Sequence, residues 1–496
     1  MAERFGLDNA TALRHGSCGC PTQPPRLRQP LPPREKAMNP AATFPNALAM
    51  IGDTPMVEIT RLDTGRCRLF LKLESQNPGG SIKDRIGRSM IEAAEAEGLL
   101  KPGGTLIEAT AGNTGLGLAL VAAQKGYRLV LVVPDKMAQE KIFHLRALGA
   151  EIFLTRSDVG KGHPDYYQDM AERMARENGW FYVNQFGNPA NPRAHETTTG
   201  PEIFAQMQGD LDAVVCGIGS AGTITGLSHF FARKLPTVEM VLADPEGSIL
   251  AHYVRTGEVK QEVGSWLVEG IGEDFVPPIA DLSRVHKAYS ISDKEAMLTA
   301  RELLAKEGIL AGSSTGTLVA AALRYCREQS AAKRVVSFVC DSGNKYLSKM
   351  FNDYWMLDQG LIERERRGDL GDLVSHRHED RATVTVGRKD TLLTAHGRMK
   401  LYDISQLPVL DEDGKVVGIL DEEDLLFRVM EAPERFRDPV ESAMSKRIET
   451  IEVTRPLAEL KPIFAKGHVA IVMEGQRFLG LITRMDLLSY LRRRIT

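Results

Sequence analysis

The sequence predicts an α/β core over residues 41–360, followed by a tandem pair of small α+β modules. Two observations indicate the core: short apolar runs without polar alternation, and longer amphipathic stretches between them. Strands with this pattern are buried on both faces, as in parallel sheets covered by helices. A third observation, an internal repeat near the C-terminus, indicates the pair of modules.

The first forty residues differ in composition from the rest of the chain. Six of the thirteen positions in 21–33 are proline. Proline interrupts helices and cannot donate a hydrogen bond to a sheet, so we expect an extended or disordered tail over residues 1–40. We expect no haem or metal ligand set from His15, Cys18 and Cys20, because no histidine follows the two thiols nearby.

The core is expected to contain two parallel sheets with helices between the strands. The apolar runs 129–133, 213–216 and 335–339 are predicted as strands. The amphipathic stretches between such runs are predicted as helices over 89–98, 139–148 and 294–307.

The repeat follows a charged stretch after residue 360, where we expect a linker over 361–374. Residues 409–420 match residues 471–482 without gaps. The match predicts two strands, a turn and the start of a helix, present twice. We place the two modules at residues 375–434 and 440–496.

The overall composition excludes several classes of protein. The 496 residues are 43% hydrophobic and 26% charged, and 62 Lys+Arg against 65 Asp+Glu give a net charge of −3. We therefore expect no nucleic-acid or membrane partner. No run approaches the ~18 apolar residues of a membrane span. Six cysteines without a C-x-x-C pair predict a reducing cytoplasm and no metal site.

Four clusters of small and polar residues follow the predicted strands or open the predicted helices. They are Asn77–Arg85, Thr110–Gly117, Gly219–Gly226 and Gly308–Gly316. In the first cluster, Lys83 stands behind a Pro-Gly-Gly turn at the start of a helix. The positive end of a helix dipole lowers the pKa of an amine, which a Schiff-base lysine requires. The alternative interpretation of this cluster is a helix N-terminus with a solvated lysine, because such a site has the same local sequence.

The other clusters suit anions. Amides, hydroxyls and a helix N-terminus in 110–117 suit a carboxylate. The glycine loop 219–226 can surround a phosphate, and Ser220 and Thr223 add hydroxyl donors. This loop lacks the Gly-Lys-Ser/Thr of a P-loop. In the fourth cluster, small hydroxyl residues at a helix start are also ordinary N-caps.

In order and spacing, the four clusters resemble the fold-type II pyridoxal-phosphate enzymes, in particular the cysteine synthase and cystathionine β-synthase family. Residues 45–351 carry the resemblance. The stretch 268–275, Val-Glu-Gly-Ile-Gly-Glu-Asp-Phe, looks like the cystathionine β-synthase side of this family. The tandem modules resemble the regulatory CBS-domain pair, also called a Bateman module.

The resemblance assigns residues to the cofactor and the substrates. It implies that Lys83 holds pyridoxal phosphate through its amine and removes the α-proton as general base. The implied cofactor contacts are Asn113 at the 3′ oxygen, Ser314 at the pyridine nitrogen, and Gly219, Ser220, Ala221, Gly222 and Thr223 at the phosphate. The implied substrate contacts are Thr110, Gly112, Thr114, Gln185 and Gly272. In the second module, Gly480, Thr483 and Asp486 match the pattern that binds an adenosyl ligand.

The chain departs from the family pattern at four points. Ala111 stands where relatives carry serine. Ala221 replaces a glycine, which is tolerable if its φ is negative. Glu273 stands where animal relatives carry tyrosine, and Asp421 stands where the first module would need threonine or serine. No segment matches the haem-binding N-terminus of animal forms, so we expect no haem.

The resemblance implies condensation of serine with homocysteine to cystathionine and water, with hydrogen sulfide release from cysteine as a side activity. Cysteine synthase activity on O-acetylserine and sulfide is the main alternative. A serine or threonine dehydratase and a nucleotide sensor on an inactive core are weaker ones. The module pair either binds S-adenosylmethionine or AMP, or only packs and sets the oligomer. We expect a homodimer or tetramer.

Overall fold

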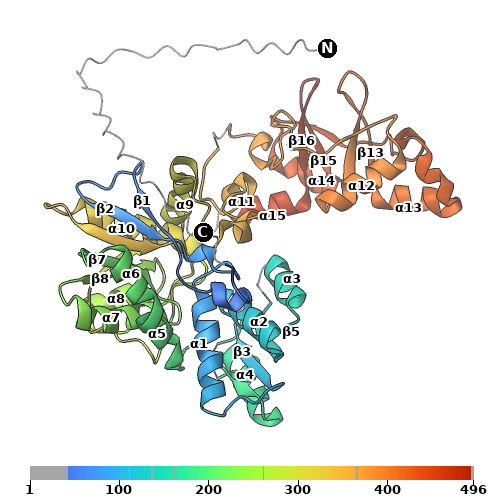
Figure 1. Ribbon diagram of the computed structural model, residues 1–496. Coiled ribbons are helices and arrows are strands. Elements are labelled where there is room, and N and C mark those ends of the chain that lie inside the picture. Colours follow the sequence, from blue (N-terminus) through green and yellow to red (C-terminus); the bar gives the residue numbers. More distant parts are fainter. Residues whose placement is uncertain are drawn as a thin grey trace, which may run out of the picture. The chain divides into compact units, whose positions relative to one another are not determined.

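The computed structural model describes residues 43–492 except 111, 136–138, 161, 261 and 365–366. The predicted tail, with His15, Cys18 and Cys20, lies outside the described residues. Within them, no helix is both long enough and apolar enough to cross a membrane. Figure 1 shows the arrangement of the elements.

The larger of two core sheets has six strands in the order β1-β2-β10-β7-β8-β9. Their bounds are β1 Met56–Ile59, β2 Arg68–Lys72, β7 Ala213–Gly217, β8 Glu239–Pro245, β9 Val285–Ile291 and β10 Arg334–Phe338. All neighbours are parallel except β1, which is antiparallel to β2. The expectation of wholly parallel sheets is wrong at this edge, because a short connection without a crossover helix joins β1 to β2.

The smaller sheet has four parallel strands in the order β5-β4-β3-β6. Their bounds are β3 Thr105–Ala109, β4 Arg128–Pro134, β5 Glu151–Thr155 and β6 Phe181–Tyr182. In β4, Leu129 and Leu131 belong to the core cluster formed with α1 and α2, whereas Val130 and Val132 belong to the cluster formed with α4. Both faces of β4 are buried, which explains why its sequence does not alternate.

Helices connect the strands of both sheets. They are α1 Lys83–Ala96, α2 Asn113–Lys125, α3 Gln139–Ala147, α4 Tyr167–Asn178, α5 Ala190–Ala194, α6 Gly200–Gln206, α7 Gly222–Lys234, α8 Leu250–Thr256, α9 Asp293–Glu307, α10 Ser313–Arg327 and α11 Asp353–Asp358. The helices predicted over 139–148 and 294–307 agree with α3 and α9. The helix predicted over 89–98 begins six residues earlier, so Lys83 is its first residue.

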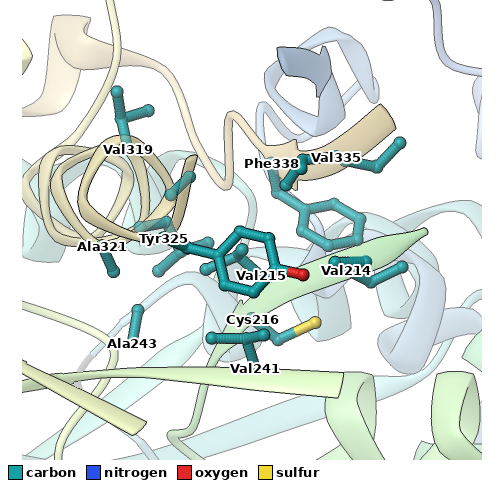
Figure 2. Packing of buried hydrophobic residues seen from close by; sticks show 14 of the residues in the cluster. Val214, Val215, Cys216, Val241, Ala243, Val319, Ala321, Tyr325, Val335 and Phe338 are labelled. Carbon is teal, nitrogen blue, oxygen red and sulfur yellow. The ribbon is translucent and has the colours of Figure 1, made fainter. Parts of the chain in front are cut away.

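The core of the larger sheet lies beneath α10. Figure 2 shows Tyr325 of α10 over Val215 and Cys216 of β7, with Val241 of β8 and Phe338 of β10 around them. These side chains are buried, and Tyr325 is among the largest fully buried residues. The first turn of α10, which carries Ser314, is therefore anchored by a tightly packed helix.

The repeat near the C-terminus forms two modules of like topology. The first contains β11 Val386–Gly387, α12 Leu392–Tyr402, β12 Gln406–Leu410, β13 Val416–Asp421 and α13 Glu422–Glu431. The second contains β14 Thr450–Glu452, α14 Leu460–Ala465, β15 Ala470–Glu474, β16 Arg477–Ile482 and α15 Arg484–Arg492. The repeated strands, turn and helix start are confirmed, and each sheet gains a short parallel strand from outside the repeat.

Candidate active site

A cavity of about 690 Å³ brings together segments from both core sheets. Its wall includes every core residue assigned above to cofactor or substrate. These are Lys83, Thr110, Gly112, Asn113, Thr114, Gln185, Gly219, Ser220, Ala221, Gly222, Thr223, Gly272 and Ser314. They come from the loops after β3, β6 and β7, from the segment between α8 and β9, and from the first turns of α1, α2, α7 and α10. The structure thus places them together, and their individual roles stay proposals.

Lys83 is the first residue of α1 and points its half-buried side chain to the cavity. The preceding turn places Gly80 at φ +77°, a conformation that favours glycine. The Lys83 N–H donates to Ser81 Oγ at 3.2 Å. Burial lowers the pKa of the Lys83 amine, with weaker opposing effects from Cys340 and Glu273. A lowered pKa leaves more of the amine uncharged, as nucleophilic attack and proton removal require.

Asn113 begins α2 and is held by two charged side chains from the segment after β10. Its Nδ2 donates to Asp341 Oδ2 at 2.8 Å, and its Oδ1 accepts from Lys345 Nζ at 2.7 Å. Tyr346 also donates to Asp341 Oδ2, at 2.7 Å. These bonds define the orientation of the Asn113 amide. They also link α2, which follows a strand of the smaller sheet, to the segment after β10 of the larger sheet.

The loop 219–223 turns sharply from β7 into α7. Ala221 has φ +68°, so the negative φ under which alanine would be tolerated at this position is not met. Alanine in this left-handed region costs about 1–2 kcal/mol relative to its ordinary conformation. The neighbouring positions are also constrained, since a Cβ on Gly219 would lie 2.5 Å from the Gly270 carbonyl oxygen. The loop is thus held tightly where backbone N–H groups and a helix N-terminus can meet a phosphate.

Two buried side chains support the hydroxyl groups of this loop. Asn191 Nδ2 donates to Ser220 Oγ at 3.0 Å. His195 Nε2 lies 3.2 Å from Thr223 Oγ1, and its Nδ1 lies 3.0 Å from Thr199 Oγ1. Burial lowers the pKa of His195 well below its usual value, with a further contribution from Arg85. His195 is therefore neutral and holds Thr223 by hydrogen bonding rather than by charge.

The predicted carboxylate site lies at the start of α2. Thr114 Oγ1 donates to Gln185 Oε1 at 2.7 Å, which joins the loop 110–114 to the loop after β6. The Gln185 N–H donates to Glu108 Oε2 at 3.3 Å. Burial raises the pKa of Glu108 to about 8. Ala111, the departure from the family pattern in this loop, lies outside the described residues.

Ser314 is buried in the first turn of α10 and faces the cavity. Its neighbour Ser313 accepts the N–H of Glu269 at 3.0 Å, and Thr315 Oγ1 accepts the N–H of Cys340 at the same distance. A serine hydroxyl at a pyridine nitrogen cannot supply the charge that an aspartate would.

Three acidic side chains of the loop 269–274 lie on the wall. Glu269, Glu273 and Asp274 all line the cavity. Burial raises the pKa of Glu273 to about 8, and Asp274 adds to this rise while Lys83 opposes it. The peptide of Glu273 is fixed because its N–H donates to Ser248 Oγ at 3.1 Å and its carbonyl accepts from the same hydroxyl at 3.1 Å.

These features fit pyridoxal phosphate. An amine with a lowered pKa stands at the cavity, and a glycine loop at a helix N-terminus offers donors for a phosphate. By contrast, the described residues hold no group of three or more His, Cys, Asp or Glu side chains that could bind a metal ion.

Comparison with known proteins agrees with this geometry. Residues 48–341 match the family described as pyridoxal-phosphate dependent enzyme, and residues 379–431 and 440–493 match CBS domains. The chain is 37% identical to cystathionine beta-synthase of Oryctolagus cuniculus over 476 residues, covering 91% of this chain and 85% of the relative. The chain belongs to the cystathionine beta-synthase family.

Two further proteins of this family are similar to the chain. Cystathionine beta-synthase of Dictyostelium discoideum is 36% identical, covering 90% of this chain and 92% of the relative. The crystal structure of an O-acetylserine dependent cystathionine beta-synthase from Helicobacter pylori superposes with a TM-score of 0.57 at 34% identity. The match covers 62% of this chain and 98% of the chain in that structure. The α/β fold-type II core and the CBS pair predicted from the sequence are thus confirmed.

The residues assigned to an adenosyl ligand lie at the junction of β16 and α15. Asp486 Oδ2 accepts from the N–H of Thr483 at 2.7 Å and from its hydroxyl at 2.6 Å. Ser375 Oγ donates to Asp486 Oδ1 at 2.5 Å. In the first module, Asp421 caps α13 by accepting from the N–H of Asp424. An adenosyl ligand at Asp486 would therefore replace or share these bonds.

Sequence reasoning missed the residues that support the site from behind. Glu108, His195, Asp341 and Lys345 each hold an assigned residue, although Glu108 does so through the backbone of Gln185. Glu108 directly precedes the carboxylate loop, so its place in an apolar strand was a usable signal. The other three lie in segments without a recognisable pattern.

Proposed function

We propose that this protein condenses L-serine with L-homocysteine to L-cystathionine and water, using pyridoxal phosphate. The observation that carries the proposal is that thirteen assigned residues line one cavity in a chain matched along about nine-tenths of its length by cystathionine beta-synthases. The enzyme is then a pyridoxal-phosphate-dependent lyase. Release of hydrogen sulfide from cysteine follows as a side activity, because the same steps break the Cβ–S bond when cysteine replaces serine, and the sulfur leaves as hydrogen sulfide.

Each group of residues has one task in this reaction. Pyridoxal phosphate, when bound, supplies an electron sink at the α-carbon. Thr110, Thr114 and Gln185 hold the carboxylate of serine, with Gly112 and Gly272 shaping the space beside it. The Lys83 amine removes the α-proton and later returns it. The Cβ–O bond of serine breaks, a Cβ–S bond to homocysteine forms, and the hydroxide leaves as water with the thiol proton.

Ser314 favours this elimination over transamination. A neutral hydroxyl leaves the pyridine nitrogen less positively charged than an aspartate partner would. The cofactor then withdraws electron density from the α-carbon less strongly. The negative charge then stays nearer the α-carbon, where it expels the β-substituent. The buried position of Ser314 at the cavity is consistent with this role.

The main competing substrate is O-acetylserine. The Helicobacter pylori relative is named as O-acetylserine dependent, although it spans only the core of this chain. Because both donors share the amino acid portion, Thr114 and Gln185 cannot tell them apart. Two versions of this alternative exist, with homocysteine or with sulfide as the acceptor.

Product identity tests the proposal. Purified protein loaded with pyridoxal phosphate is given serine or O-acetylserine, each with homocysteine or sulfide, and products are measured by mass spectrometry. We expect cystathionine from serine and homocysteine as the fastest reaction. Cysteine as the dominant product would instead make this a cysteine synthase. Lys83→Ala is the inactive control and is expected to lack the visible absorbance band of the bound cofactor.

The proposal includes no haem. The sequence holds no segment similar to the haem-binding N-terminus of animal forms. The same purified protein is therefore expected to show the cofactor band without a Soret band. A Soret band that follows the protein through purification would contradict this part of the proposal.

We further propose one adenosyl-ligand site per chain, at Gly480, Thr483 and Asp486. The CBS pair supports it, and Asp421 disfavours an equivalent site in the first module because its carboxylate would repel a phosphate. Calorimetry with S-adenosylmethionine and with AMP is expected to show binding that Asp486→Ala removes. No heat with either ligand would mean that the pair only packs.

A further inference from the structure

The proposed reaction needs places for two amino acids, and the residues assigned above bind only the first. The second substrate, homocysteine, also carries a carboxylate, and hydrogen bonds from a cation are the strongest that a carboxylate can accept. Among the described residues on the cavity wall, three are lysines. The described part of the wall contains no arginine and no histidine. Lys83 is committed to the cofactor and the α-proton. Lys141 and Lys349 are therefore left for a second carboxylate.

These two lysines share one carboxylate on the wall. Lys141 of α3 and Lys349 both form ion pairs with Glu269, and the Lys349 Nζ–Glu269 Oε1 distance is 2.8 Å. The Lys141 side chain is only 6% exposed. The two ammonium groups lower the pKa of Glu269, so it is ionised. Two cations and one anion give the cluster a net charge of +1, which leaves capacity for a further carboxylate.

The cluster is tied to the groups that face the reacting atoms. The Glu269 N–H donates to Ser313 Oγ, next to Ser314. The Lys141 ammonium lies 5.2 Å from the centre of the Tyr346 ring, and the Tyr346 hydroxyl donates to Asp341, which accepts from Asn113. An amino acid held by this cluster would thus lie in the same cavity as Lys83, with its thiol three carbon atoms from its carboxylate carbon.

We propose that Lys141 and Lys349, organised by Glu269, bind the α-carboxylate of the thiol substrate. The inference rests on the proposed function and names the site of its second substrate. Before the thiol substrate binds, Glu269 forms ion pairs with both lysines. The nearly buried ammonium group of Lys141 is therefore not left without a partner. The incoming carboxylate then takes over part of those bonds.

The test compares a thiol that has a carboxylate with one that lacks it. Lys349→Met and Lys141→Met keep much of the stem volume and remove the charge. Each is expected to lower kcat/KM for homocysteine by about tenfold to a hundredfold, the range for a lost hydrogen bond to a charged group. The rate with 2-mercaptoethanol as the thiol, and the KM for serine, are expected to stay within about twofold. Lys349→Arg is expected to recover part of the homocysteine activity.

Glu269→Gln gives a change of opposite sign. It frees both lysines from their internal partner, so the KM for homocysteine is expected to fall. If Lys141, Lys349 and Glu269 only close the cavity wall, then Lys141→Met, Lys349→Met and Glu269→Gln lose activity equally with both thiols, which would overturn the proposal. Equal and unchanged activity in all variants would overturn it as well. Lys306→Met, at an exposed ion pair on α9, is the matched control.

Failure of the proposed function gives a different result. If the protein is a cysteine synthase, the unaltered protein does not use homocysteine, whereas its reaction of O-acetylserine with sulfide is fast. If O-acetylserine is the donor and homocysteine the acceptor, the lysine variants are tested with O-acetylserine in place of serine. Retained cofactor absorbance and an unchanged melting temperature in each lysine variant exclude unfolding as the cause of a selective loss.

Discussion

Glu108 is a buried carboxyl group at the end of β3, directly before the loop assigned to the substrate carboxylate. It is 1% exposed and accepts the backbone N–H of Gln185. Burial raises its pKa from 4.5 to about 8, despite several backbone donors that oppose the rise. At neutral pH the group is therefore largely protonated in the folded protein and ionised in the unfolded chain. Folding takes up a proton at this position.

This uptake predicts a pH dependence of stability. Between pH 4.5 and about 8 the folded state binds more protons at Glu108 than the unfolded state, so stability falls as pH rises. The slope for one such group is about 1.4 kcal/mol per pH unit. Glu108→Gln removes this contribution. The difference in unfolding free energy, variant minus unaltered protein, is expected to grow in favour of the variant from pH 5 to pH 8.

Denaturant unfolding at several pH values checks this expectation. The altered hydrogen bonds of a glutamine add a constant to the difference in unfolding free energy between the variant and the unaltered protein. This constant does not depend on pH. A difference that stays flat from pH 5 to pH 8 would contradict the raised pKa of Glu108.

The residues at the site divide into those that a local pattern reveals and those that only the fold reveals. Lys83, Asn113 and Ser314 stand in glycine-rich or hydroxyl-rich clusters at helix starts, so the sequence predicts them as candidates. Asp341 and Lys345 bond to Asn113 across more than 200 positions of the chain. No local pattern can encode such a contact, because it depends on how two sheets meet.

At the scale of elements, the crossing of α1 and α2 positions Lys83 relative to Asn113. The two helices meet at glycines. A Cβ on Gly117 would lie 2.7 Å from the Lys83 carbonyl oxygen, and a Cβ on Gly87 would lie 2.7 Å from the Gly117 carbonyl carbon. Neither helix can carry a side chain at this contact without moving. The close approach therefore depends on the absence of a methyl group.

We predict that Gly117→Ala separates α1 from α2. Overpacking of this kind costs about 1–3 kcal/mol, and here it also displaces the backbone of Lys83. The melting temperature and the affinity for pyridoxal phosphate are both expected to fall, the latter measured by fluorescence titration. Gly397→Ala in α12 is the control, because a Cβ there meets nothing within 4 Å. Alanine is the better helix former by about 1 kcal/mol, so this variant should be at least as stable.

If Gly117→Ala leaves both the melting temperature and the cofactor affinity unchanged, the helix contact does not position the site. A loss of the same size in Gly397→Ala would also contradict this account.

Some elements follow from the sequence and others do not. The apolar run of β4 predicts its strand because both faces are buried, and the repeat predicts β12, β13, β15 and β16. The edge strand β1 gives no clear signal, since it is short and only partly buried. The two-residue and three-residue strands β11 and β14 are too short for any periodicity. Their pairing is set by tertiary packing.

At the scale of the whole molecule, the catalytic core is expected to fold without the CBS pair. All the cavity residues lie between Ile82 and Trp355. The solved structure of the Helicobacter pylori relative matches 62% of this chain over 98% of its own chain, so a chain of about the size of the core folds in that structure. Leu361 and Ile362 belong to a hydrophobic cluster with Met350 and Met356, so the boundary must lie beyond them.

We therefore predict that a chain ending at residue 364 binds pyridoxal phosphate and forms cystathionine. Ending the chain at residue 360 removes Leu361 and Ile362 from their cluster and is expected to lower the melting temperature. The measurements are cofactor absorbance, thermal unfolding and product formation on both truncated chains. A chain ending at 364 that cannot bind the cofactor would show that the pair is needed to build the site.

A competition in one tube tests the proposed reaction of serine with homocysteine directly. Serine, O-acetylserine, homocysteine and sulfide are supplied at equal concentrations to the full-length protein loaded with pyridoxal phosphate. Serine labelled with ¹³C distinguishes its products from those of O-acetylserine by mass. We predict that labelled cystathionine is the dominant product. Unlabelled cysteine as the dominant product would contradict it.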